Sequence, residues 1–216
     1  RDRAHARRGR RPVRVVATVP WFAELEAALK SAAEESQRLS RLADHLLVLA
    51  RSDRGRLEVR KTPVDIRKMV ALTTARFETR AKALGITINE DVPADTTARI
   101  DELKIEQAIS NLLENALRYT PRNGSIEVRI ESNGHELLVH VADSGPGFSS
   151  EFIPRAFEPF SRTDGARGRE DGGAGLGLAI VRAIVEAHDG SVQALNRVTG
   201  GAEVILRIPT AANATT

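Results

Sequence analysis

Hydrophobic residues recur at steps of three and four over residues 22–51, and charged or polar residues fill the remaining positions. This spacing predicts one long helix with a narrow apolar seam, which is typical of helices that pack in a bundle or coiled coil. An amphipathic helix lying on a neighbouring domain would show the same spacing. The seam consists of Leu25, Leu29, Ala32, Ser36, Leu39, Leu42, Leu46 and Leu49.

Beyond residue 56 the pattern mixes helical spacing with apolar–polar alternation. Helices are predicted over 65–84, 101–119 and 176–188. The chain order predicts an α+β fold, a two-layer α/β sandwich with one mixed or antiparallel sheet and helices on one face, preceded by the long helix. The expected strands cover residues 57–59, 86–89, 97–100, 126–130, 137–141, 192–195 and 204–208.

Three local signals fix the ends of these elements. The carboxylate of Asp101 can cap the helix that follows it, because it can accept hydrogen bonds from free backbone N–H groups. Asn133-Gly134 predicts a hairpin turn. Gly190 predicts a helix stop.

The chain divides into four predicted segments: an Arg-rich irregular stretch (1–21), the long helix (22–55), the mixed α and β domain (56–209) and a flexible tail (210–216). Residues 1–14 hold seven arginines and one aspartate, a local charge of +6, so the rest carries −3 of the total of +3. A basic tail on an acidic body is not typical of a nucleic-acid-binding domain, so no nucleic-acid partner is expected. Binding of acidic polymers by the Arg-rich start is a weaker hypothesis.

The sequence contains no cysteine, which excludes disulfides and thiolate chemistry and fits a reducing compartment. No apolar run approaches the roughly 18–20 residues of a membrane helix, and no signal peptide is visible. Because the chain starts at Arg1 rather than Met, it is expected to be an excerpt, with any upstream anchor left open. The expected location is the cytoplasm, either free or as the cytoplasmic part of a membrane sensor.

Candidate chemistry begins on helix 101–119. At 100° per residue, Asn111, Asn115 and Arg118 share one side of this helix with Lys104, and Tyr119 follows them. Amide oxygens can ligate Mg²⁺, a cation that usually keeps waters and phosphates as its other ligands. A solvated polar face would show the same residues.

Three further stretches suit a nucleotide, although each also suits an ordinary turn or loop. Asp143 ends a predicted strand before Gly145 and Gly147, where backbone can approach a ligand closely. Glycines at 172–177 open a helix, whose N-terminal N–H groups can meet an anion. Residues 155–162 lead into a polar loop at 163–172 that could form a lid, with Phe157 and Phe160 expected to anchor its base.

The four stretches together resemble the sensor histidine kinases of bacteria. NLLENALRYTP is similar to the family's N box, DSGPGF to its first glycine box, FEPFSR to its F box and GGAGLGLAIV to its second glycine box. Residues 64–209 resemble the catalytic and ATP-binding domain, a Bergerat-type fold. Residues 22–51, with RLSRLADHLLVLARSD, resemble the second helix of the dimerisation hairpin.

The resemblance implies a role for each matched residue, with ATP and Mg²⁺ as the bound groups. Asn115 would hold Mg²⁺ with Asn111 beside it, Arg118 would reach phosphate and Tyr119 would lie against adenine. Asp143 would bind the adenine amino group, and Arg162 would meet the γ-phosphate. The nucleotide would be lined by Gly145 and Gly147, and its phosphates would be wrapped by Gly173, Gly175, Leu176 and Gly177.

One contrast separates relatives that share this fold. Gyrase-like and chaperone-like ATPases are known for a glutamate at the position of Asn111, where it activates water. An amide cannot deprotonate water, and Glu114 lies about 60° around the helix from the asparagines. The site is therefore expected to hold ATP for another nucleophile, as a phosphotransferase does.

The histidine that receives the phosphoryl group is not convincingly present. Counting back along the expected hairpin reaches His5, which lacks the acidic neighbour of the family pattern and is followed by Gly9 and Pro12. Three readings stay open: an acceptor upstream of Arg1, an acceptor on a separate partner protein, or a degenerate hairpin.

The predicted function is that of a protein-histidine kinase module in a two-component system, which phosphorylates a histidine in trans and then serves a response regulator. Homo- or heterodimerisation through residues 22–51 is plausible. The alternative is a non-catalytic ATP-binding scaffold that recruits another kinase through its leucine seam.

Overall fold

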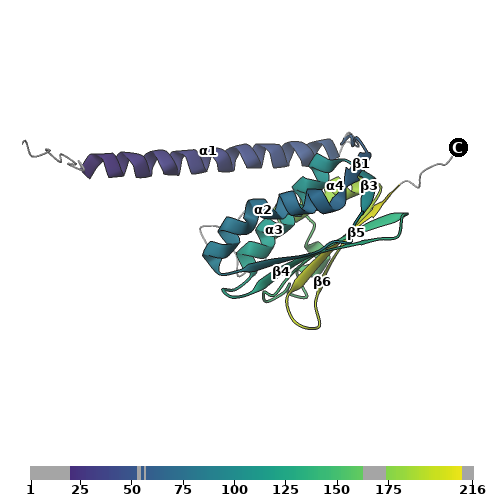
Figure 1. Ribbon diagram of the computed structural model, residues 1–216. Helices are drawn as coiled ribbons and strands as arrows, with labels where there is room; N and C mark the ends of the chain where they lie inside the picture. Colours follow the sequence, from purple (N-terminus) through teal and green to yellow (C-terminus); the bar gives the residue numbers. More distant parts are fainter. Residues whose placement is uncertain (1–19, 53–54, 56, 163–173, 211–216) are drawn as a thin grey trace, which may run out of the picture. The chain divides into compact units, whose positions relative to one another are not determined.

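The computed structural model describes residues 20–52, 55, 57–162 and 174–210, with backbone alone at several positions of the first helix (Figure 1). The helices are α1 (Pro20–Ser52), α2 (Ile66–Leu84), α3 (Glu102–Tyr119) and α4 (Gly177–Ala187), with a 3₁₀ turn η1 (Ile153–Arg155). The strands are β1 (Thr62–Asp65), β2 (Thr87–Asp91), β3 (Thr97–Ile100), β4 (Ser125–Ser132), β5 (Glu136–Asp143), β6 (Ser191–Asn196) and β7 (Ala202–Pro209).

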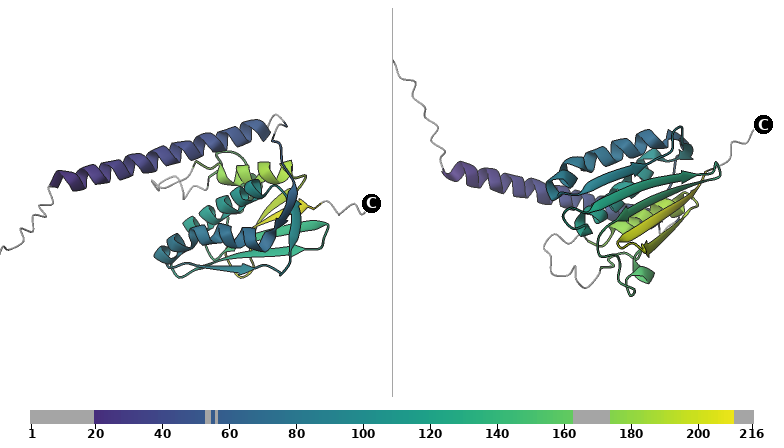
Figure 2. Two further views of the ribbon diagram at one scale, coloured as in Figure 1. Left: turned by 45° about the horizontal axis from the view of Figure 1, so that its top comes forward. Right: turned by 60° about the horizontal axis from the view of Figure 1, so that its bottom comes forward.

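The main sheet has five strands in the order β2-β4-β5-β7-β6. The strand β2 runs parallel to β4, and the other neighbours are antiparallel, so the sheet is mixed. Helices α2, α3 and α4 cover one face of it, as Figure 2 shows. This is the expected two-layer sandwich.

The expectation of a single sheet is wrong, because β1 and β3 form a separate antiparallel pair. The strand expected at residues 57–59 is also wrong, since the paired residues are Thr62–Asp65. Pairing with β3 decides this strand, and that partner lies more than thirty residues further along the chain. Local alternation at 57–59 could not reveal it.

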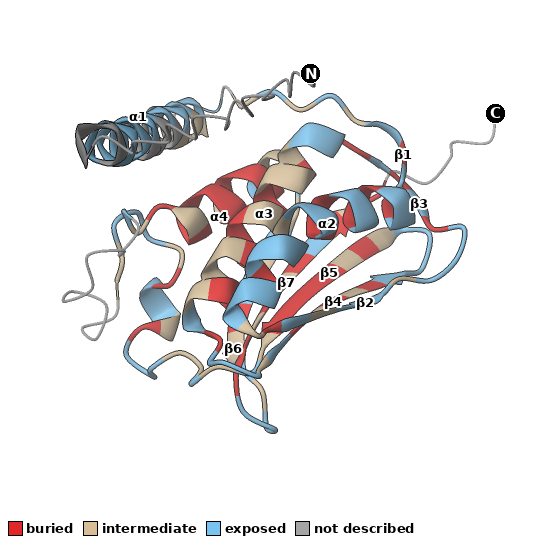
Figure 3. Ribbon diagram, turned by 60° about the vertical axis from the view of Figure 1, so that its left-hand side comes forward, coloured by how far each residue is buried: buried red, intermediate tan, exposed pale blue. Residues whose placement is uncertain are grey.

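The core lies between the five-stranded sheet and the helices, where Figure 3 shows the buried residues. Alternate residues of β4, β5 and β7 point to the helices and are almost fully buried, as their period of two predicts. Each buried aliphatic side chain contributes about 1.5–3 kcal/mol relative to an exposed one. The layer combines Ile126, Val128, Ile130, Leu137, Val139, Val141, Val204, Leu206 and Ile208 with Ile105, Ile109, Ile180 and Ile184 of α3 and α4.

The chain divides into two compact units, residues 1–41 and 42–216. In the first unit, the seam residues Leu25, Leu29 and Leu39 are exposed. In the second unit, Leu42 and Leu49 from the last turns of α1 pack against the core. The expected long helix is therefore present. Its seam is exposed in the first unit and packs in part against the core in the second.

Side-chain caps begin the helices that carry the site. Asp65 accepts from the Lys68 N–H at 3.0 Å, and Asp101 accepts from the Lys104 N–H at 3.2 Å, as expected for Asp101. At the other end of the fold, Thr210 is not frayed as expected. It is buried, and its N–H donates to the carbonyl oxygen of His135 at 2.8 Å.

No helix in the described ranges is both long and apolar enough to span a membrane. Residues 1–19 of the expected Arg-rich segment, including His5, and residues 211–216 of the expected tail lie outside the described residues, whereas Pro20 and Trp21 belong to α1 and not to an irregular stretch.

Candidate functional site

Helix α3 carries a row of polar side chains on an otherwise buried element. Asn111 is only 7% exposed, and its Nδ2 is buried without a hydrogen-bond partner in the part of the chain that the structure describes. Leaving a buried amide donor unpaired costs about 1–3 kcal/mol. One turn further on, Asn115 is half-buried, and Arg118 follows it. Asn111 is thus a buried amide donor whose hydrogen bond is not made within the described residues.

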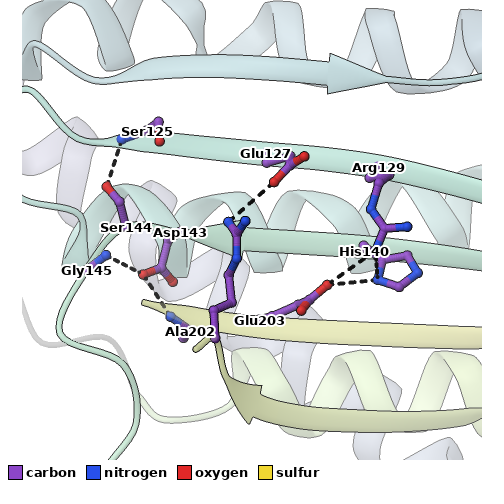
Figure 4. Close-up of polar contacts among 10 residues, drawn as sticks. Ser125, Glu127, Arg129, His140, Asp143, Ser144, Gly145, Ala202 and Glu203 are labelled. Carbon is purple, nitrogen blue, oxygen red and sulfur yellow. Dashed lines mark hydrogen bonds and ion pairs between the residues drawn. The ribbon is translucent and has the colours of Figure 1, made fainter. Parts of the chain in front are cut away.

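Asp143 lies at the end of β5, where Figure 4 shows its contacts. Its Oδ1 accepts from the Gly145 N–H at 2.7 Å and from the Ala202 N–H at 3.3 Å. Both bonds that the described residues donate to this carboxylate end on Oδ1, so Oδ2 is left for another donor. Such a carboxylate can accept from an exocyclic amine.

Burial raises the pKa of Asp143 above its usual value, because desolvation disfavours the charged carboxylate. The hydrogen bonds from Gly145 and Ala202 and the charge of Arg197 oppose this rise. The carboxylate therefore sits in an environment that stabilises its charge incompletely. A donor from a ligand would supply the missing stabilisation.

The end of α3 and the loop after β5 are in direct contact. A methyl group built on Gly145 would lie 2.8 Å from the carbonyl oxygen of Tyr119 and 2.8 Å from Oδ1 of Asp143. Only glycine fits there. The ring-bearing Tyr119, which is 37% exposed, therefore ends α3 beside the carboxylate of Asp143.

The glycine stretch before α4 meets the polar row of α3. The position of a Cβ on Gly177 lies 3.8 Å from Nδ2 of Asn115. The residue before this helix is Leu176, which has no side-chain oxygen to cap the first turn and which packs in the core. The N–H groups of the first turn of α4 are thus suited to an anion beside Asn115.

The F-box segment, residues 157–162, lies against the glycine stretch that precedes α4. Gly175 has a φ of +71°, and a Cβ on it would lie 2.9 Å from the backbone of both Phe160 and Ser161. Arg155 and Arg162 line a hollow of about 390 Å³ at this point. The two ends of the expected lid therefore meet at Gly175.

One expectation about this segment is wrong. Phe157 packs against the core as expected, but Phe160 is 63% exposed and cannot anchor the base of the loop. Its backbone, with a φ of +64°, lies beside Gly175. Gly173 and the expected lid at 163–172 lie outside the described residues.

Sequence reasoning missed the turn between β6 and β7 as part of the site. Asn196, Gly201 and Ala202 all contact the loop that begins at Asp143. These contacts join segments about fifty residues apart, so no local pattern reports them. The pair Gly200-Gly201 was the one available signal, because it marks backbone with special conformations.

Comparison with known proteins agrees with this geometry. Residues 100–212 match the family described as histidine kinase-, DNA gyrase B- and HSP90-like ATPase. The Signal transduction histidine-protein kinase BaeS of Escherichia coli (strain K12) is 37% identical over 171 residues, which cover 79% of this chain and 37% of BaeS. The Probable sensor histidine kinase HK of Mycobacterium tuberculosis (strain CDC 1551 / Oshkosh) is 40% identical over 187 residues, which cover 87% of this chain and 48% of that protein.

The fold also matches solved structures. The crystal structure of full-length ShkA in complex with AMPPNP superposes with a TM-score of 0.75 at 30% identity, over 88% of this chain and 40% of ShkA. The chain thus spans less than half the length of these relatives. The chain belongs to the histidine kinase-, DNA gyrase B- and HSP90-like ATPase family, in which its matched relatives are sensor histidine kinases.

Proposed function

We propose that this chain is the ATP-binding catalytic part of a protein-histidine kinase in a two-component system. It binds Mg·ATP and transfers the γ-phosphoryl group to a histidine. A ring nitrogen of that histidine attacks the γ-phosphorus, the bond to the bridging oxygen breaks, and ADP leaves. The relatives named above and the ShkA complex with AMPPNP, an ATP analogue, support this proposal.

The observation that carries the proposal is the pair of asparagines on α3. Asn115 offers its amide group next to the start of α4, Asn111 lies one turn earlier on α3, and neither can take a proton from water. A site with these groups favours positioning and charge neutralisation over hydrolysis. It therefore suits transfer to a nucleophile that arrives from elsewhere.

The adenine end of ATP is assigned to Asp143 and Tyr119. Oδ2 of Asp143 would accept from the adenine amino group, and Tyr119 offers its ring at the neighbouring end of α3. The phosphate end is assigned to the first turn of α4, with Arg118 and Arg162 as cations. Gly145, Gly147, Gly175 and Gly177 would line the nucleotide with their backbone, and the same role is expected of Gly173, which lies outside the described residues.

The donor set also fits Mg²⁺. No cluster of three or more histidine, cysteine or acidic side chains able to hold a metal occurs in the described ranges. An amide oxygen from Asn115, with Asn111 beside it, suits a cation that takes phosphates and waters as its other ligands. When bound, Mg²⁺ supplies neutralisation of phosphate charge. Asn115 then orients the phosphates relative to α4.

Two kinds of protein partner are proposed: one that carries the histidine and one that accepts the phosphoryl group from it. We assign the phosphorylated histidine to a partner protein or to a region outside this chain, and the next acceptor to an aspartate of a response regulator. Residues 22–51 would supply the dimer contact, since Leu25, Leu29 and Leu39 are exposed. A cysteine-free chain that uses ATP suits the cytoplasm, including the cytoplasmic part of a membrane sensor.

The test uses γ-labelled ATP with the full chain alone, and then with candidate histidine-bearing helical-hairpin proteins. We expect label to appear on a partner as an acid-labile, base-stable phosphoramidate. Strong self-labelling that His5→Ala abolishes would contradict transfer in trans. ATP binding with no transfer to any of these proteins would instead favour the non-catalytic scaffold.

A further inference from the structure

We propose that Asn196 is a positioning residue that sets the adenine specificity of the site by clamping the loop from Asp143 to Phe148. This inference rests on the proposed function, in which Asp143 receives the adenine amino group. Asn196 is the last residue of β6 and has no place among the four family boxes.

The clamp consists of two hydrogen bonds between one side chain and one peptide residue. Oδ1 of Asn196 accepts from the Phe148 N–H at 2.7 Å, and Nδ2 of Asn196 donates to the Phe148 carbonyl oxygen at 2.7 Å. Both polar groups of a loop residue are thereby satisfied by a single amide. An amide is suited to this pairing because it carries a donor and an acceptor side by side.

The loop is shaped to receive this amide. Gly147 has a φ of +79°, and a Cβ on it would lie 2.6 Å from Oδ1 of Asn196. A side chain at residue 147 would therefore push Asn196 away from Phe148. The glycine that ends the DSGPG sequence makes room for the clamp as well as for a ligand.

The same turn holds the other end of the loop. Ala202 donates to Asp143, and the position of a Cβ on Gly201 lies 1.8 Å from the carbonyl oxygen of Asp143. The loop is thus fastened to the β6–β7 turn at its first residue by Ala202 and at its last residue by Asn196. With both ends fixed, Oδ2 of Asp143 is held in one direction.

Asn196 is exposed, so its bonds add little to the packing of the core. Its replacement releases the loop and leaves the sheet in place. The released loop must be ordered again when a ligand binds, and this lowers affinity for a base that Asp143 reads. The loss should therefore be larger for a purine with the exocyclic amine than for a purine without it.

The test compares the full chain with Asn196→Ala and Asn196→Asp. Titration calorimetry measures the Kd of ATP and of purine riboside triphosphate, which lacks the 6-amino group, both with Mg²⁺. A matched control is Asn133→Ala, because the side chain of Asn133 also makes two hydrogen bonds to backbone: its Oδ1 accepts from the N–H groups of His135 and Glu136, at the opposite end of β5.

We expect Asn196→Ala to weaken ATP binding about tenfold, as the loss of two net hydrogen bonds allows. For Asn196→Ala, the ratio of the Kd of purine riboside triphosphate to the Kd of ATP should fall toward one. Asn196→Asp keeps the bond from the Phe148 N–H and loses the donor, so it should fall between the parent and Asn196→Ala. Asn133→Ala should bind both nucleotides as the parent does.

The outcomes separate the two proposals. If the parent binds ATP with a preference for the 6-amino group and Asn196→Ala keeps both affinity and preference, the clamp is refuted and the proposed function stands. If the parent does not bind ATP, the proposed function fails first. A melting temperature measured for every variant shows whether it is folded, and Asn196→Asp supplies the comparison should Asn196→Ala prove unstable.

Discussion

Nε2 of His188 accepts a hydrogen bond from the backbone N–H of Asp101 at 3.1 Å. The ring is fully buried, and its Nδ1 lies 2.8 Å from the carbonyl oxygen of Ile184, so the neutral ring donates there. This histidine joins the start of α3 to the end of α4. The two helices of the candidate site are thus tied together at the end remote from Asn115 and Gly177.

The first prediction concerns acid stability. Burial lowers the pKa of His188 below 6.5; the hydrogen bond to the Ile184 carbonyl and the charge of Asp101 oppose this shift, and the charges of Lys61 and Lys104 add to it. Because the pKa of His188 is lower in the folded state, the unfolded chain binds its proton at a higher pH than the folded chain as the solution is acidified. The stability from the neutral ring is therefore complete above about pH 6.5 and is lost as the pH falls from there through the folded-state pKa.

Thermal denaturation of the parent and of His188→Gln between pH 5 and pH 8 checks this prediction. Glutamine can accept from the Asp101 N–H but does not titrate, so its variant should show a shallower decline below pH 6.5. Parallel curves for the two proteins would show that His188 is not responsible. His188→Ala should lose about 1–3 kcal/mol at pH 8, because it leaves the Asp101 N–H without its acceptor.

Asp143→Asn should abolish measurable ATP binding while the melting temperature at neutral pH stays equal or rises. Burial raises the pKa of Asp143, so stability falls as the pH rises from the unfolded-state pKa to the folded-state pKa, and the full loss is present above the folded-state pKa. The amide oxygen of asparagine still accepts from Gly145 and Ala202. Calorimetric titration and a melting curve check both parts, and retained ATP affinity would overturn the assignment of Asp143.

Asn111→Leu should stabilise the nucleotide-free protein and weaken nucleotide binding. Leucine keeps the branching of asparagine and removes the buried Nδ2, whose missing partner costs about 1–3 kcal/mol, although the larger volume of leucine offsets part of this gain. Urea denaturation measures the gain, and titration with Mg·ATP measures the loss. A variant less stable than the parent would mean that Nδ2 is satisfied in solution.

Asn115→Ala should weaken ATP binding in the presence of Mg²⁺ and leave the much weaker binding in EDTA unchanged. The amide oxygen of Asn115 is the expected metal ligand, so only the metal-dependent part of the affinity should fall. Isothermal titrations with and without EDTA measure this difference. Equal losses under both conditions would point to a contact with ATP itself.

Two adjacent glycines provide a matched pair. Gly201→Ala should lower both stability and ATP affinity, because its Cβ would collide with the carbonyl oxygen of Asp143. Gly200→Ala has almost the same φ, +92° against +93°, but meets nothing within 4 Å. Gly200→Ala should lose only about 1 kcal/mol of stability, which is the cost of a non-glycine residue with a positive φ. Similar affinities for the two variants would show that the clash is absorbed without moving Asp143.

The elements that sequence alone predicted well are those with strong local causes. Alternation in β4 and β5, the Asp101 cap and the Asn133-Gly134 turn all depend on residues close in sequence. The strand β1 was misplaced because its partner, not its own composition, decides where it pairs. The mixed fold class followed from the order of the elements and needed no long-range detail.

The candidate site divides in the same way. Its boxes were found because they are contiguous, and their individual roles remain predictions. The role proposed for Asn196 could not be predicted from sequence, because it depends on hydrogen bonds to Phe148, forty-eight positions away. Phe160 was misjudged because an aromatic residue in a loop suggested burial, whereas its side chain is 63% exposed.

The position of β7 between β5 and β6 in the sheet has a consequence for biosynthesis. The last strand in sequence is an interior one, so β5 has only β4 as a neighbour until Ala202–Pro209 leaves the ribosome. Before that moment, β5 of a nascent chain has no second strand to pair with, and Asp143 has no hydrogen bond from Ala202. The carboxylate of Asp143 therefore gains its full set of backbone hydrogen bonds only once the last strand of the domain is in place.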